Sequence, residues 1–469
     1  MKRLYQRGIK WLQEHRIPLG LFLVTILIFF GRTIFLQQFY FFGDLKVMFY
    51  PLESEYSTFQ NQWSLPQWSS HFGFGQPLMA WAQIGFFTPV HLILRVFQLH
   101  ALVLIHLSMA IHFLIGLIGM YCFMRKRDVS TLGAFLAAIV FVFNGYTIYH
   151  LVHVNFFVAT MWIPWLLLAI DAWFQKPKGY WLSMMSLLSA FMLLSGHLQL
   201  VLYCLIVVLL WAIVLLIAHW RLEMRWLLRV SLSALLVLAL TAGLSSLALF
   251  PIYEFLPDND RRGGYTEEEF YVFSFPPHHA ITLVLPSFFG SQGNYKGAKS
   301  EQELGSYVGI IPLLLAGLAC IRYKYIFSQR TQQRILLIYA VILFVVSVAF
   351  ALGQYSPVYR WLVDAQLFPA FTAPGRFLIF FATAIAILAG IGCDVVPTLA
   401  RRAYRSHLFW QLGPILLASV ITIVPLGSKM GTDSAFLQAV KNLPALPPLE
   451  LASALLGLCL WGALWMIRH

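Results

Sequence analysis

A single carboxylate, Asp44, stands among aromatic residues shortly after the first apolar stretch of the chain. It belongs to residues 41–51, which open a segment too polar to cross a bilayer and too apolar for a free linker. One interpretation is a solvated loop residue, or the N-cap of a helix that starts near Lys46, because aspartate is a favoured cap. The other interpretation is that Asp44 carries chemistry.

The residues around Asp44 bear on whether that chemistry would need a metal. One carboxylate supplies too few ligands for a divalent cation, which prefers several oxygens. Glu53 or Glu55 would have to fold back toward Asp44 to complete a site. No HxxxH or HExxH spacing occurs, and the five cysteines include no CxxC pair. The pattern favours chemistry without a metal, with a divalent cation as the less favoured alternative.

Further polar residues lie near the ends of apolar stretches. His153 with Asn155, and His197 with Gln199, stand at the tips of two neighbouring hairpins. Polar residues at this depth usually line a cavity. The alternative for each histidine is a ring at the membrane interface that bonds to the backbone. We expect His153 and His197 to meet near Asp44.

Basic, acidic and aromatic residues complete the set of candidates, each with a simpler alternative. Arginine suits phosphate because its planar fork donates two hydrogen bonds at once. Arg376 could instead be a cation that reaches from a helix end to the interface. The same alternative applies to Lys46. Arg261 and Arg262 could form a solvated turn balanced by Asp258 and Asp260, Glu254 could be an ordinary loop carboxylate, and Tyr50 could belong to the interfacial aromatic belt.

The composition shows which class of protein positions these residues. Of the 469 residues, 60% are hydrophobic and 11% are charged, whereas soluble domains carry about 25% charged residues. The fold class is therefore all-α, a polytopic transmembrane bundle, and we expect a single membrane domain over 1–469. The first apolar run lacks an A-x-A cleavage pattern and is predicted to be an uncleaved span.

Apolar segments of about 20 residues can each cross the bilayer as a helix. On this criterion the sequence predicts about twelve spans, of which the fifth and eighth are short: 17–36, 101–124, 131–149, 156–174, 180–195, 198–218, 230–250, 307–321, 335–352, 376–395, 408–427 and 449–467.

The distribution of charge predicts the orientation. Lysine and arginine gather in the short segments 125–127, 221–229 and 401–405, which places both termini in the cytoplasm. This bias also accounts for the net charge of +13 without a nucleic-acid partner. Two long segments, 37–100 and 251–306, then lie outside as extracytoplasmic loops. The first is expected to hold two interfacial helices, 47–61 and one with Pro89 in its first turn, joined by a glycine-rich turn.

A long outside loop after the first span, a second after the seventh, and an aspartate at the start of the first loop resemble the arrangement in the GT-C superfamily of membrane glycosyltransferases. Within it, short stretches resemble the YfhO-like bacterial membrane proteins: Gly43-Asp44 with Tyr50-Pro51, LPQW at 65–68, GFGQP at 73–77, SGHLQ at 195–199 and APGRF at 373–377. Many GT-C enzymes carry paired acidic residues where Asp44 stands between Gly43 and Leu45. YfhO-like proteins are commonly longer, so a C-terminal part could be missing here.

The resemblance implies a glycosyltransferase of the cell (inner) membrane with its active site on the extracytoplasmic side. A polyprenyl-phosphate-linked sugar would be the donor, within membrane lipid, and a cell-envelope glycan, lipid or protein would be the acceptor. Asp44 would act as general base, a role worth ~10²–10⁴-fold in rate. Lys46, Tyr50, His153, His197, Gln199, Glu254, Arg261, Arg262 and Arg376 would bind substrate.

Two rival functions remain open on sequence grounds. A twelve-span transporter of small molecules or lipids has a matching span count and topology, but the long loops lie on one side and no internal repeat is evident. A non-catalytic protein of envelope assembly would keep a cavity without needing Asp44.

Overall fold

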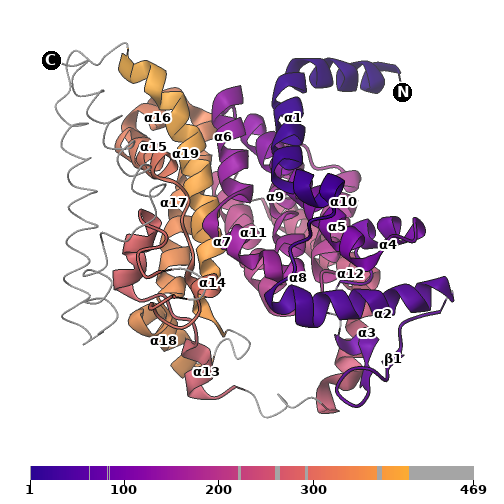
Figure 1. The fold of residues 1–469 in the computed structure, drawn as a ribbon. Coiled ribbons are helices and arrows are strands. Elements are labelled where there is room, and N and C mark those ends of the chain that lie inside the picture. Colours follow the sequence, from indigo (N-terminus) through magenta and orange to yellow (C-terminus); the bar gives the residue numbers. More distant parts are fainter. Residues whose placement is uncertain are drawn as a thin grey trace. The chain divides into compact units, whose positions relative to one another are not determined.

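A computed structural model describes residues 2–400, apart from 63, 82, 84, 220–222, 259–264, 291–293 and 367–371. Its regular structure is almost entirely helical (Figure 1). The described residues fall into two compact units, one from 2–126 with 151–258 and one from 127–150 with 265–400. We call them unit 1 and unit 2 and describe each by itself. The single domain expected over 1–469 stays a prediction.

The chain is an all-α polytopic membrane bundle, as its composition predicts. Eight described segments are long and apolar enough to cross a membrane: Gln13–Leu36, Ala101–Lys126, Thr131–Val152, Val154–Gln175, Leu198–Ala218, Met224–Asp258, Thr331–Ala351 and Pro374–Thr398. A ninth would be Ile310–Ile321 with Tyr323–Gln329, a pair bent by 64°. The fifth predicted span is a short apolar helix, Gly179–Leu193. The spans predicted at 408–427 and 449–467 lie outside the described residues.

Unit 1 holds most of the first predicted loop and the helices that support it. Its elements are α1 (Lys2–Leu36), η1 (Leu45–Phe49), α2 (Tyr50–Asn61), β1 (Trp68–Ser69), β2 (Gln76–Pro77), α3 (Leu78–Trp81), α4 (Pro89–Val96), α5 (Ala101–Lys126), α8 (Val154–Thr160), α9 (Ile163–Gln175), α10 (Gly179–Leu193), α11 (Leu198–Ala218), α12 (Met224–Phe255) and η3 (Leu256–Asp258). The short η2 (His150–Val152) lies where the two units divide.

Close packing holds the long helices of unit 1 together. A Cβ atom on Gly119 of α5 would lie 2.5 Å from Trp165 Nε1 of α9, so the two helices meet at a residue without a side chain. Trp165 Nε1 donates to the Ile115 carbonyl at 2.9 Å. The buried Trp211 of α11 makes the corresponding bond to the Leu167 carbonyl at 3.1 Å. Each tryptophan thus satisfies its one donor while its ring fills the helix interface.

The first loop contains the two helices expected from sequence. The run η1–α2 covers 45–61, and α4 begins with Pro89 at a position where its missing N–H costs no hydrogen bond. Between them, β1 and β2 pair antiparallel, with Trp68 opposite Pro77. The glycine-rich turn joins these strands: Gly75 has φ +113°, and a Cβ there would lie 2.7 Å from the Trp68 ring.

A buried ion pair fastens α2 to α4. The Arg95 guanidinium donates from Nε to Glu53 Oε1 at 2.9 Å and from Nη2 to Glu53 Oε2 at 2.7 Å. Its Nη1 donates to the Phe86 carbonyl at 2.6 Å. The side chains are 0% and 2% exposed for Glu53 and Arg95. On its other side α4 exposes Leu92, Ile93 and Val96, as expected of a helix at a membrane interface.

Unit 2 is built around α19 (Leu378–Ala400), an apolar helix buried along most of its length (Figure 1). Its other elements are α6 (Thr131–Val142), α7 (Gly145–Tyr149), α13 (Glu267–Tyr271), η5 (Pro277–Leu283), α14 (Glu301–Leu304), α15 (Ile310–Ile321), α16 (Tyr323–Gln329), α17 (Thr331–Ala351), η6 (Gly353–Tyr355), α18 (Pro357–Asp364) and η7 (Pro374–Phe377).

Glycines let α19 approach its neighbours. A Cβ on Gly392 would collide with the Leu315 carbonyl of α15, and a Cβ on Gly133 of α6 would lie 2.5 Å from the Gly390 carbonyl of α19. Small residues at such contacts allow close van der Waals packing, which drives helix association in membranes. At one end of α19, Asp394 Oδ2 accepts from Arg330 at 3.0 Å and from Gln333 at 2.8 Å.

We predict that Gly392→Val lowers the stability of the protein by about 1–3 kcal/mol, because the new side chain must push α15 away from α19. The measurement is thermal unfolding in detergent. Gly243→Val in α12 is the matched control, since a Cβ at Gly243 meets nothing within 4 Å. Equal unfolding temperatures for the two variants would contradict this account of the packing.

Candidate active site

Asp44 lies where the chain enters the helical run η1–α2. Its backbone is already helical, with φ −62° and ψ −24°, and its side chain makes no capping hydrogen bond. Asp44 thus stands at the N-cap position of η1 without the capping hydrogen bond that the N-cap interpretation implies. Gly43 before it has φ +52°, a conformation strained for other residues, and a Cβ there would lie 3.3 Å from Val152 Cγ1. This turn brings the chain beside the segment that leads into α8.

His153, the residue just before α8, holds the Asp44 carboxylate. Its Nε2 donates to Asp44 Oδ2 at 3.0 Å, and its Nδ1 is buried. The Asp44 side chain is 49% exposed and that of His153 is 19% exposed. Asp44 Oδ1 makes no hydrogen bond to any residue that the structure describes. The Asp44 side chain is thus partly open to solvent, while its Oδ2 is held by His153.

This hydrogen bond also sets the charge of Asp44. The bond from His153 lowers the pKa of Asp44 and outweighs partial burial, which raises it. The carboxylate is consequently ionised at neutral pH and can accept a proton. The N-terminal end of η1–α2 adds a positive partial charge that favours an anion.

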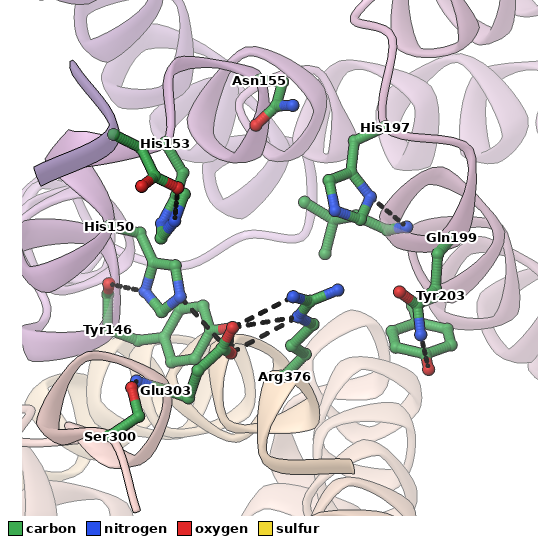
Figure 2. A network of polar contacts seen from close by, with 12 residues as sticks. Tyr146, His150, His153, Asn155, His197, Gln199, Tyr203, Ser300, Glu303 and Arg376 are labelled. Carbon is green, nitrogen blue, oxygen red and sulfur yellow. Dashed lines mark hydrogen bonds and ion pairs between the residues drawn. The ribbon is translucent and has the colours of Figure 1, made fainter. Parts of the chain in front are cut away.

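The second histidine, His197, contacts the same aromatic ring as His153, and its meeting with His153 near Asp44 stays a prediction. The Phe156 ring is close to both, with centroid distances of 5.1 Å to His153 and 4.8 Å to His197. His197 stands before α11, where its Nδ1 accepts from the Leu200 N–H at 3.1 Å. Figure 2 shows the rings of His153 and His197 with Asn155 above them. Asn155 Nδ2 donates to Gln83 Oε1 at 3.4 Å.

The remaining candidates of unit 1 lie in different surroundings. Gln199 donates to the Tyr203 hydroxyl at 2.8 Å. Lys46 is exposed, with its ammonium 6.0 Å from the centre of the Phe41 ring, and Tyr50 packs edge-on against the same ring. Glu254 is exposed in the last turn of α12, which extends to Phe255 and so shortens the loop expected from residue 251. Arg261 and Arg262 lie outside the described residues.

The two glutamates considered as partners for a metal at Asp44 are engaged elsewhere. Glu53 is held by Arg95. Glu55 accepts from the Ser69 hydroxyl at 2.7 Å and contacts His71 Nδ1 at 3.2 Å. The alternative in which they fold back toward Asp44 is wrong. In the part of the chain that the structure describes, no group of three or more metal-ligating side chains occurs; a metal-free base stays a prediction.

Arg376 belongs to a polar cluster within unit 2. Its Nη2 donates to Glu303 Oε1 at 3.0 Å, and its Nε lies 3.2 Å from the same oxygen. His150 Nε2 lies 3.5 Å from Glu303 Oε2, and the Tyr146 hydroxyl donates to that oxygen at 3.4 Å. The Tyr146 and His150 rings stack at 3.9 Å. Figure 2 shows the Arg376, His150 and Tyr146 side chains around the Glu303 carboxylate, so Arg376 is engaged in an ion pair.

Glu303 is the centre of this cluster and carries its negative charge. Burial raises the pKa of Glu303, but the Arg376 charge and the hydrogen bonds from His150 and Arg376 outweigh that effect and hold the pKa well below its usual range. The carboxylate is only 7% exposed. The buried Glu303 carboxylate is therefore ionised, and the Arg376 guanidinium compensates its charge.

Sequence reasoning did not single out Glu303, Tyr146 or Arg95. Ser300 and Glu303 carry the spacing of a helix start, and the Ser300 hydroxyl does accept from the Glu303 N–H at 3.3 Å. That pattern locates α14 but not the ion pair, because Arg376 is 73 residues away. For Arg95 the sequence offers only a single cation in an amphipathic helix, and this does not predict its ion pair with Glu53.

We predict that Arg376→Gln lowers the free energy of unfolding by about 3–5 kcal/mol, because it leaves the buried Glu303 charge uncompensated. Adding Glu303→Gln to that variant removes the charge and should recover part of the loss. Thermal unfolding of the single and double variants in detergent measures both effects.

The exposed Arg360 of α18 provides the control, since Arg360→Gln should change stability by no more than about 0.5 kcal/mol. An Arg376→Gln variant as stable as this control would show that the ion pair does not stabilise unit 2.

Comparison with known proteins supports the membrane assignment. Residues 17–461 match the sequence profile of a family described as bacterial membrane protein YfhO. No curated protein matches the chain.

Proposed function

The chain belongs to the YfhO family of bacterial membrane proteins, and from this premise we propose that it is a GT-C-type glycosyltransferase. Its donor would be a polyprenyl-phosphate-linked sugar and its acceptor a component of the cell envelope. The observation that carries the proposal is the Asp44 carboxylate, half-exposed and held on one oxygen by His153.

In the proposed reaction the acceptor hydroxyl lies against Asp44 Oδ1. The hydroxyl proton passes to Oδ1 as the hydroxyl oxygen bonds to the anomeric carbon of the sugar. The bond between that carbon and the phosphate oxygen breaks, and its electrons leave with the polyprenyl phosphate. His153 keeps the carboxylate oriented through Oδ2, so positioning precedes the chemical step.

The lowered pKa of Asp44 has two opposing consequences for a base. It keeps the carboxylate ionised, but it also makes the group a weaker proton acceptor. The rate of sugar transfer therefore depends on holding the acceptor hydroxyl close to the ionised Asp44 carboxylate while the new bond forms.

The other proposed ligands would bind the donor and the acceptor. Lys46 and Tyr50 follow Asp44 on the same helical run, and His197 and Gln199 open α11. Glu254 would bind a sugar hydroxyl, and Arg261, Arg262 and Arg376 would bind the lipid phosphate. For Arg376 this role requires it to act while paired with Glu303.

The proposed orientation has both termini in the cytoplasm and Asp44 on the extracytoplasmic side of the inner membrane. It is supported by the lysine and arginine bias of the short segments between spans.

We predict that Asp44→Asn reduces sugar transfer by about 10²–10⁴-fold, because the amide cannot accept the proton. The assay measures transfer from a labelled polyprenyl-phosphate sugar by the purified protein. Asp364→Asn, which changes an exposed carboxylate of α18, should leave transfer unchanged. Full activity of the Asp44 variant would refute the catalytic assignment, and solute uptake without transfer would favour a transporter.

We predict that His153→Phe raises the pKa of Asp44, since it removes the hydrogen bond that lowers it. Loss of the ionised base on acidification then begins at a higher pH, so the acid limb of the pH–rate profile moves upward. Lost positioning should also reduce transfer at neutral pH by up to roughly 10²-fold. His153→Gln restores a donor and should keep the profile nearer to the original. An unmoved acid limb in His153→Phe would contradict the positioning role.

A further inference from the structure

Helices α10 and α12 of unit 1 run parallel to each other. The Ser186 hydroxyl of α10 donates to the Val237 carbonyl of α12 at 3.5 Å, and the Thr241 hydroxyl donates to the Ser186 carbonyl at 3.4 Å. Leu182, one turn before Ser186 on α10, lines the same groove as Ser233 and Leu236 of α12. The first turns of both helices therefore point to the same end, where their free N–H groups favour an anion.

A groove of about 440 Å³ lies between these two helices near that end. Its apolar wall consists of Leu182, Leu228, Leu232 and Leu236, and Ser233 leaves room in the middle. The three leucines of α12 recur every four residues, so they form one row along the helix. The apolar wall of the groove thus follows α12 for about two helical turns.

Two exposed arginines close the polar end of the groove. Arg225 and Arg229 are four residues apart on α12 and form a row with Ser233 that lies beside the row of leucines. Lys176 and Lys178 precede the first turn of α10, while Glu223 precedes α12. Cations outnumber the acid at this end, and apolar side chains follow them along the helix.

We propose that this groove binds an anionic diacyl phospholipid. The guanidinium groups of Arg225 and Arg229 hold the phosphate, since their planar forks donate paired hydrogen bonds to phosphate oxygens. One acyl chain lies along Leu228, Leu232 and Leu236. A basic site between membrane helices favours anionic over zwitterionic headgroups because each lysine or arginine adds attraction to negative lipid.

Labelling with photoactivatable lipids in nanodiscs tests the proposal. The probes are phosphatidylglycerol and phosphatidylcholine with identical acyl chains, and mass spectrometry locates the adducts. We expect the phosphatidylglycerol probe to label residues 179–193 and 224–240 more strongly than phosphatidylcholine. Arg225→Gln with Arg229→Gln should reduce that labelling by about tenfold or more.

Three further variants separate groove binding from general charge and from misfolding. Lys324→Gln with Arg334→Gln removes two charges from unit 2 and should leave the labelling unchanged. Arg225→Lys with Arg229→Lys keeps the charge and should retain most of it. Ser233→Trp fills the groove beneath intact arginines and should abolish labelling at both helices, with thermal unfolding in detergent confirming that the variant is folded.

The proposal is overturned if the two lipids label the groove equally or if the glutamine variant labels as strongly as the original protein. It is also overturned if Ser233→Trp labels fully, because the acyl chain would then lie elsewhere. Cross-linking of these residues to another segment of the chain in place of lipid would show that protein covers the groove.

Discussion

The buried ion pair between Glu53 and Arg95 is the contact on which the first loop of unit 1 depends. It joins α2, whose helical run begins beside Asp44, to α4, and Arg95 also binds the Phe86 carbonyl. Removing one partner of such a pair typically costs about 3–5 kcal/mol, because the other charge stays buried alone. The ion pair therefore ties α2 to α4, and Asp44 stands at the start of a helical run that this contact supports.

Three carboxylates differ in what surrounds them, and this difference separates the buried Glu53 and Glu303 from the proposed base, Asp44. Glu53 and Glu303 are buried, and each forms an ion pair with an arginine from another part of the chain. These ion pairs hold separate secondary-structure elements together. Asp44 accepts a hydrogen bond from His153 through Oδ2, and its side chain is 49% exposed. A base needs a defined position and access to its substrate, and of these three carboxylates Asp44 has both.

The parts of the structure that follow from local composition could be predicted from the sequence. Span positions follow from hydropathy because the bilayer demands about 20 apolar residues per helix, and the turn into α4 followed from Pro89. The contact of both His153 and His197 with Phe156 is consistent with their positions after apolar spans at the same predicted face. The ion pairs of Glu53 and Glu303 were not predicted, since each joins residues far apart in the chain and no local pattern records such a pairing. The N-cap position of Asp44 followed from local sequence, but its hydrogen bond to His153 did not, because His153 is 109 residues away.

Chemical rescue tests the central claim, that Asp44 is the proton acceptor in transfer, most directly. Asp44→Ala leaves a space beside His153 in which formate can take the place of the lost carboxylate. The account predicts that this variant is nearly inactive in the transfer assay and that added formate, but not chloride at the same ionic strength, restores part of its activity. Transfer by the alanine variant at the original rate without formate would contradict the claim.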